Sequence, residues 1–207
     1  MRSRSHEKIH IEGPAGRLEV VVTDPGESRS GYAIVAHPHP LYGGTLENKV
    51  VQTLAKAMYA LGYAAVRFNF RGVGESDGVF DEGPGELADF LSVAGFARGR
   101  FGETAPVLAG FSFGSYIAAS AVEELNPQQL VLVAPAVGRF PVGEVPKRTL
   151  VVHGEEDDVV PLGDVFDWAR PQNLPVIVFP GAGHFFHGAL VDLQNLVVRH
   201  CAGERAG

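Results

Sequence analysis

A chain of 207 residues, 45% of them apolar, can bury the core of one domain and is tight for two, so we expect a single domain over residues 1–207. Asp and Glu outnumber Lys and Arg by 24 to 17, and the formal charge of −7 disfavours nucleic acid and anionic membranes as partners. The lone cysteine, Cys201, excludes an internal disulfide and a cysteine-based metal site.

The amino-terminal residues predict a short leader followed by a β-hairpin. Residues 1–8 are polar and charged and lack the apolar core of a signal peptide, so we expect a flexible leader there. Two β-rich runs, 9–11 and 18–22, flank the turn sequence Gly13-Pro14-Ala15-Gly16 and predict an antiparallel hairpin over residues 9–24. Because no stretch approaches the ~20 apolar residues of a membrane span, we expect a cytoplasmic protein that binds no membrane.

From residue 32 onward, buried strands alternate with helices. Short apolar runs predict strands at 32–36, 64–70, 106–110, 130–134, 149–153 and 175–179. Apolar residues at helical spacing predict helices at 50–61, 87–94, 115–125, 164–169 and 190–197. This alternation is typical of an α/β fold, a mostly parallel central sheet with helices on both faces, here with the antiparallel hairpin at one edge. The segment 137–147 is too short to hold a cap domain.

Ser112 lies at the centre of Gly110-Phe111-Ser112-Phe113-Gly114, between a predicted strand and a predicted helix. A sharp turn in that position exposes the serine hydroxyl, and glycines two residues away on each side leave room for the neighbouring backbone. The same sequence also fits a glycine-rich turn without chemistry, since the chain has 26 glycines. The strand–turn–helix context favours a nucleophilic serine.

Acids and histidines follow two later strands, so that a serine, an acid and a histidine occur in that order along the chain. The loop after 149–153 carries Glu155, Glu156, Asp157 and Asp158, any of which could hold a histidine in the required tautomer. His184 follows the last predicted strand after three small residues, which leave the imidazole free to reach the serine. His187 is the alternative base, expected at the start of the last helix instead.

An acyl-transfer site also needs donors for the developing oxyanion. The backbone N–H of Phe113, next after the serine, is the first expected donor. The second should come from the loop after 32–36, where prolines leave His39, Leu41 or Tyr42, and we favour His39. A metal site at His37 and His39 lacks an acidic or cysteine partner, so we expect no metal and no organic cofactor. The turn 71–76 predicts a structural role, with Arg71 anchoring a loop.

Three blocks of the chain, 36–45 (AHPHPLYGGT), 67–74 (RFNFRGVG) and 109–114 (AGFSFG), resemble a group of small bacterial α/β-hydrolases without a lid. Members are known mostly as predicted hydrolases or carboxylesterases, and the resemblance covers roughly residues 9–200. It implies the α/β-hydrolase fold, Ser112 as nucleophile, Asp157 as acid and His184 as base. One departure concerns the oxyanion loop, because His37-Pro38 stands where the wider superfamily has His-Gly.

Together these patterns predict a serine hydrolase, close to a carboxylesterase, that acts on small carboxylic esters or thioesters through an acyl-enzyme. Its substrate should meet apolar side chains in a shallow open site, with Leu41, Tyr42, Phe111 and Phe185 as the expected substrate-binding residues. The same residues would also serve a peptidase, an amidase or an acyltransferase. A binding protein that kept the fold without turnover is the alternative from another class, and a homodimer is left open.

Overall fold

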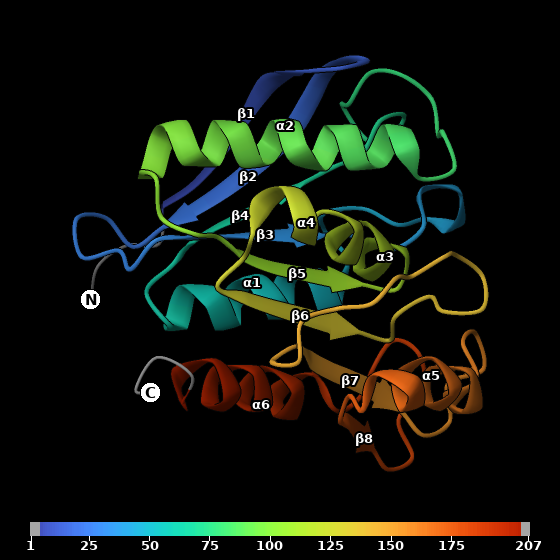
Figure 1. Cartoon of the computed structure of the whole chain (residues 1–207). Coiled ribbons are helices and arrows are strands. Elements are labelled where there is room, and N and C mark those ends of the chain that lie inside the picture. Colours follow the sequence, from blue (N-terminus) through green and yellow to red (C-terminus); the bar gives the residue numbers. More distant parts are fainter. Residues whose placement is uncertain (1–4, 204–207) are drawn as a thin grey trace.

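The computed structural model of the chain describes residues 5–203. Within them, eight strands form one sheet in the order β1-β2-β4-β3-β5-β6-β7-β8 (Figure 1). The strands are β1 Ser5–Gly13, β2 Gly16–Asp24, β3 Tyr32–Ala36, β4 Ala64–Phe68, β5 Val107–Phe111, β6 Gln129–Val133, β7 Leu150–Gly154 and β8 Val176–Phe179. The helices are α1 Lys49–Ala60, α2 Pro84–Phe101, α3 Phe113–Ser120, α4 Val122–Leu125, α5 Leu162–Ala169 and α6 Leu190–Gly203, with short 3-10 turns η1 Pro40–Tyr42 and η2 Arg170–Gln172.

Strand directions confirm the predicted fold class. β1 and β2 form an antiparallel hairpin, β2 pairs antiparallel with β4, and every pairing from β4 to β8 is parallel. Gly16, with φ of 114°, closes the hairpin turn in a conformation that favours glycine. One correction concerns the predicted leader: residues 5–8 belong to β1, because their backbones pair with residues 21–24 of β2. Residues 1–4 lie outside the described part of the chain.

The central strands are buried on both faces, which explains their continuous apolar sequences. Alternate residues point to opposite sides: Ile34 and Leu108 join the core under α2, α3 and α5, whereas Val35 and Ala109 join the core under α1 and α6. Each face of the sheet is thus covered by its own layer of helices.

The helix predicted at 115–125 differs from the observed structure. It begins earlier, at Phe113, and divides into α3 and α4 at Ala121. The Ser120 hydroxyl donates to the carbonyl oxygen of Tyr116 at 2.9 Å, a local bond of the kind that bends helices. The spacing of apolar residues carries no information about such a hydrogen bond. The sequence therefore predicted one uninterrupted helix.

The parallel strands all end at one edge of the sheet, toward which the arrows of β3, β5 and β6 point in Figure 1. The loops that follow β3, β5, β6, β7 and β8 therefore meet at this edge, where ligands bind in open α/β sheets. The loop between β6 and β7 contains no helix. This arrangement brings together segments that are up to 150 residues apart, roughly from residue 37 to residue 187.

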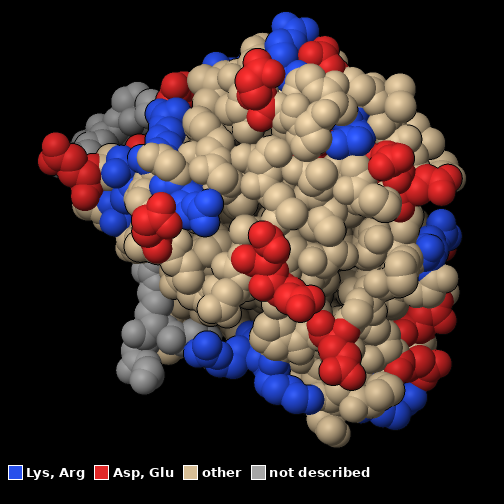
Figure 2. All heavy atoms as spheres, turned by 45° about the horizontal axis from the view of Figure 1, so that its top comes forward, with Lys and Arg blue, Asp and Glu red and all other residues tan. Residues whose placement is uncertain are grey.

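Charged side chains are spread over the surface rather than gathered by sign on the face seen in Figure 2. Acidic and basic groups are interspersed there, with uncharged surface between them. The excess of negative charge is therefore not concentrated on this face. Among the described residues, no helix has the length and apolar character that crossing a bilayer requires.

Candidate active site

Ser112 occupies the turn between β5 and α3 in a strained backbone conformation, with φ of 55° and ψ of −117°. Its N–H donates to the carbonyl oxygen of Val133 at 2.9 Å, which ties the turn to the end of β6. A Cβ on Gly110 would overlap the carbonyl of Gly114, and a Cβ on Gly114 would overlap the carbonyl of Ala36. The two glycines are therefore required by the close approach of three backbone segments.

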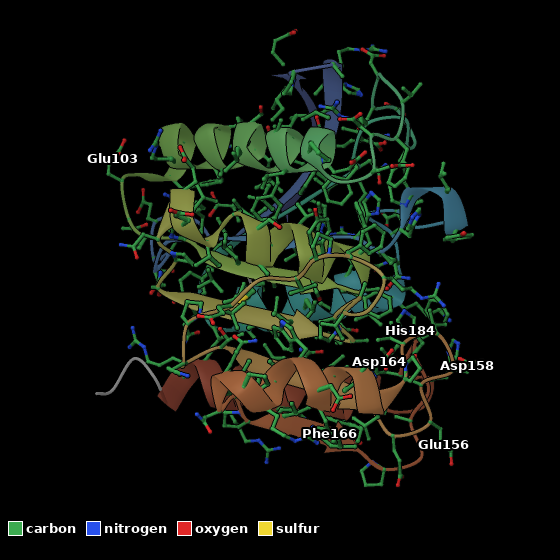
Figure 3. All side chains as sticks on the ribbon, turned by 45° about the vertical axis from the view of Figure 1, so that its right-hand side comes forward. Glu103, Glu156, Asp158, Asp164, Phe166 and His184 are labelled. Carbon is green, nitrogen blue, oxygen red and sulfur yellow. The ribbon has the colours of Figure 1, made fainter. Side chains whose placement is uncertain are left out.

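Ser112, His184 and Asp157 form one chain of hydrogen bonds. Nδ1 of His184, in the loop after β8, lies 2.7 Å from Oδ2 of Asp157, in the loop after β7. Because a carboxylate only accepts, Nδ1 carries the proton, which leaves Nε2 to accept from the Ser112 hydroxyl at 3.0 Å. Figure 3 shows His184 at the carboxyl edge of the sheet. This is the geometry of a serine that can pass its proton to a histidine.

Asp157 is buried and held by its other oxygen as well. Oδ1 accepts the backbone N–H groups of Val159 at 2.9 Å and Val160 at 2.8 Å. Burial by itself raises the pKa of this carboxyl, but the hydrogen bonds from His184 and Val160 hold it below its ordinary value. The group therefore remains a carboxylate at neutral pH.

A second histidine, His153, lies beside Asp157 and was not singled out by the sequence. Its Nε2 donates to the carbonyl oxygen of Val160 at 2.9 Å and lies 3.4 Å from Oδ2 of Asp157. Burial lowers the pKa of His153, so it is a neutral neighbour of the carboxylate. The sequence signal was its position four residues before Asp157, at the end of β7.

The alternative acids and base lie elsewhere. Glu155, Glu156 and Asp158 are exposed, and the Glu155 carboxylate accepts the N–H of Gly181 at 2.9 Å. His187 is exposed in the turn before α6, where its ring lies 6.0 Å from that of Phe185. His184, by contrast, is 4% exposed. Among these candidates, the hydrogen-bonded chain to Ser112 contains Asp157 and His184.

His37 controls the orientation of the peptide that follows Pro38. Its Nε2 accepts the N–H of Phe70 at 3.0 Å, so the proton is on Nδ1, which donates to the Pro38 carbonyl at 2.6 Å. That carbonyl and the N–H of His39 belong to one planar trans peptide and point in opposite directions. Complete burial lowers the pKa of His37 to about 4, which keeps it neutral. With both ring nitrogens engaged, His37 has none left for a metal.

The backbone N–H of Phe113 and that of His39 are the candidate oxyanion donors. Phe113 is the first residue of α3, so its N–H has no acceptor within the helix. The His39 imidazole accepts the N–H of Leu41 at 3.2 Å and packs among the rings of Tyr42, Phe80, Phe113 and Phe140. Burial lowers the pKa of His39, and the charge of Arg139 lowers it further.

A cavity of about 610 Å³ opens at Ser112. It is lined by Pro38, His39, Tyr42, Gly43, Gly44, Asn48, Ser112, Phe113, Ala136, Arg139, Phe140, Val159, Val160, His184 and Phe185. Tyr42 and Phe185 thus lie where the sequence predicted substrate contacts. Among the described residues, no group of three or more His, Cys, Asp or Glu side chains is arranged to hold a metal ion.

Two predicted substrate-binding residues need correction. Phe111 is 0% exposed, because its side chain points from β5 into the core under α1 and α6. Its ring lies 5.0 Å from that of His184, centroid to centroid, so it packs against the imidazole rather than lining the cavity. Leu41 is 69% exposed and does not line the cavity, since η1 turns it away. Asn48, Arg139 and Val159 line the wall without having been predicted.

The turn 71–76 has the structural role that its sequence predicted. The backbone N–H and the guanidinium of Arg71 donate to the buried carboxylate of Asp89, at 2.8 to 3.0 Å. Gly72 and Gly74 adopt positive φ values of 72° and 58°. This anchor fastens the loop after β4 to α2.

Comparisons with known proteins agree with this geometry. A family model described as serine aminopeptidase, S33, matches residues 41–142. An uncharacterized protein of Rickettsia prowazekii is 33% identical, in an alignment that covers 86% of this chain and 82% of that protein.

Two solved structures are similar over almost their whole length. XC6422 from Xanthomonas campestris, described as an α/β serine hydrolase without a lid, is 37% identical with a TM-score of 0.89, over 97% of this chain and 95% of that one. An α/β serine hydrolase homologue from Coxiella burnetii is 43% identical with a TM-score of 0.88, over 96% and 99% of the two chains.

Proposed function

The chain belongs to the family of small α/β serine hydrolases without a lid, and we propose that it hydrolyses small carboxylic esters or thioesters through Ser112, His184 and Asp157. The observation that carries the proposal is the continuous hydrogen-bonded chain from Asp157 through His184 to the Ser112 hydroxyl. The strained turn at Ser112 and the cavity in front of it support the same proposal.

In the first half-reaction, His184 Nε2 takes the proton of Ser112 while Oγ attacks the carbonyl carbon. The oxyanion accepts hydrogen bonds from the N–H groups of Phe113 and His39. The imidazolium, stabilised by Asp157, then gives its proton to the leaving alcohol or thiol as the bond to the carbonyl carbon breaks. The product of this half-reaction is an acyl ester of Ser112.

In the second half-reaction, water attacks the acyl-enzyme. His184 takes a proton from the water and returns it to Ser112 Oγ when the acid is released. No proton or electron is left over, and the free serine is restored. The shape of the cavity, open and lined by aromatic rings around His39 and Phe113, favours small acyl or aryl groups.

Hydrolysis of a peptide or amide bond is the second candidate, and one observation favours it. The family model that matches residues 41–142 is described as serine aminopeptidase. The same hydrogen-bonded chain would serve an amide, but the leaving amine must then receive a proton from His184 before the bond breaks. Acyl transfer differs only in the nucleophile that replaces water, and a fold without turnover remains the alternative outside enzymes.

The proposal is tested first with a fluorophosphonate probe, comparing wild type with Ser112→Ala. We expect labelling of the wild type alone, because the probe reports a serine activated by its histidine. The same two proteins are then assayed on 4-nitrophenyl acetate, a thioester of butyrate and an alanine 4-nitroanilide. Serine-dependent turnover of the esters supports esterase activity, and preferential turnover of the anilide supports the peptidase. Folded wild type that neither labels nor turns over any substrate would refute catalysis.

A further inference from the structure

The charge of the cavity wall is opposite to that of the chain. The chain has a formal charge of −7. Among the described residues that line the cavity, Arg139 is the one with a permanent charge, and no Asp or Glu lines it. The wall therefore presents a single cation in a mostly uncharged surface, close to the proposed nucleophile Ser112.

Arg139 is not used in an ion pair within the described part of the chain. Elsewhere arginines have carboxylate partners, such as Arg29 with Asp24 at 2.7 Å and Arg71 with Asp89 at 2.8 Å. No described carboxylate lies within 4.0 Å of the Arg139 guanidinium, so its five N–H donors remain for a ligand.

The backbone that carries Arg139 is well anchored. The N–H groups of Arg139 and Phe140 both donate to the carbonyl of Ala136, at 3.4 and 3.1 Å, around Gly138 with φ of 76°. The Phe140 ring stacks on Tyr116 with centroids 5.2 Å apart. The exposed side chain thus extends from a turn whose position is fixed on both sides.

The cation is also near the reaction centre. The positive charge of Arg139 lowers the pKa of the His39 imidazole, and the backbone N–H of His39 is a proposed oxyanion donor. Phe140, the next residue, packs on both His39 and Phe113, with centroids 5.8 and 4.9 Å apart. A group bound by Arg139 would therefore lie on the side of the cavity that holds the substrate carbonyl.

We infer that Arg139 binds a carboxylate of the substrate, so that the preferred ester or thioester carries one negative charge close to its scissile bond. This inference rests on the proposed hydrolysis and names its substrate class. A carboxylate matches the guanidinium in charge and in its two parallel acceptors. The Asp164 carboxylate lies beside Gly138, where a Cβ would come within 3.1 Å of Oδ2, and it is outside the cavity lining. Its charge would disfavour a second negative charge on the substrate.

The test compares charged substrates with uncharged analogues of nearly the same shape. Mono-4-nitrophenyl adipate places the carboxylate in the acyl part, and its methyl ester is the neutral analogue. The butyrate ester of 4-hydroxybenzoic acid places the carboxylate in the leaving group, again with its methyl ester for comparison. For each pair, the ratio of kcat/KM for the charged over the neutral substrate is the measured preference, and the pair that shows it locates the carboxylate.

We expect wild type to prefer the charged member of one pair by about five- to tenfold, the range for a charge-assisted contact at an exposed side chain. Arg139→Gln should abolish the preference and Arg139→Lys should keep part of it. Arg199→Gln is the matched control, because it removes the same charge from the exposed surface of α6, outside the cavity lining. A preference that is absent in wild type, or unchanged in Arg139→Gln, would overturn the inference.

Direct binding separates this inference from the proposed function. The same compounds are titrated by calorimetry into Ser112→Ala and into the double variant with Arg139→Gln, so that no turnover is needed. Tighter binding of a charged compound than of its neutral analogue, lost in the double variant, supports the role of Arg139 even if wild type hydrolyses nothing. Equal binding of charged and neutral compounds would refute it, while serine-dependent ester hydrolysis could still stand.

Discussion

Asp157→Asn tests the proposed acid. An asparagine side chain at that position can form hydrogen bonds in two orientations, and we expect each of them to lower the activity. In the first orientation, the amide oxygen accepts the hydrogen bonds from the N–H groups of Val159 and Val160, and the amide NH₂ group faces Nδ1 of His184. Nδ1 must then accept, so the proton moves to Nε2 and points at Ser112. A histidine in this tautomer cannot take the serine proton.

In the second arrangement the amide is flipped and the productive tautomer is kept. The NH₂ group then faces the N–H groups of Val159 and Val160, which lose their acceptor. The N–H of Val160 is buried and that of Val159 is partly buried. At about 1–3 kcal/mol for each donor left without an acceptor, the flipped form is disfavoured by roughly 2–6 kcal/mol. Since about 1.4 kcal/mol is a factor of ten, we expect kcat/KM to fall by at least about 30-fold and by as much as about 10⁴-fold.

The assay is hydrolysis of 4-nitrophenyl acetate between pH 6 and 9, with the rate of fluorophosphonate labelling as a second measure of serine reactivity. Asp158→Asn is the matched control, because its carboxylate is exposed next to Asp157 and takes no part in the hydrogen-bonded chain. Thermal unfolding of both variants checks that they fold. The reasoning is refuted if Asp157→Asn keeps activity within about threefold of wild type, or if the control loses as much.

Two further predictions concern stability. Gly114→Ala should lower the free energy of unfolding by about 1–3 kcal/mol, because its Cβ would overlap the carbonyl of Ala36. Urea unfolding measures this free energy. Gly143→Ala is the control and should change it little, because a Cβ there would meet no atom within 4 Å. The hydrogen bond from Arg29 holds the pKa of Asp24 below its ordinary value. Asp24→Asn should therefore lower the free energy of unfolding by about 1 kcal/mol at pH 7. This difference between variant and wild type should shrink below about pH 4, as the Asp24 carboxyl of the folded wild type is protonated. An equal difference in unfolding free energy at pH 7 and pH 2.5 would contradict the prediction.

Much of the fold follows from local sequence because the central strands are continuous apolar runs. Tyr32–Ala36 has the bounds that its sequence predicted, and the bounds of the other parallel strands shift by one or two residues at most, whereas β1 begins earlier than predicted, at Ser5. The order Ser112, Asp157, His184 was predictable for a related reason. Ser112 directly follows β5, whereas Asp157 and His184 lie in the loops that follow β7 and β8. Parallel strands bring their carboxyl ends to one edge of the sheet, so these positions meet there.

The cavity wall was harder to predict because it depends on how side chains turn within short loops. Leu41 and Tyr42 are neighbours in η1, yet only Tyr42 lines the cavity. Arg139 and Asn48 reach the wall from loops with no periodicity. Phe111 is different: period-two alternation with Val107 and Ala109 would have assigned it to the core under α1 and α6.

The contact between Gly114 and the carbonyl of Ala36 has a consequence for anyone who wishes to change the specificity of this protein. The end of β3, the peptide oriented by His37 and the turn at Ser112 form one interlocked backbone unit. Randomising residues there would disturb nucleophile and oxyanion donors together. Libraries directed at Arg139, Val159 and Phe185, whose side chains line the cavity from the other loops, would alter the substrate and leave that unit intact.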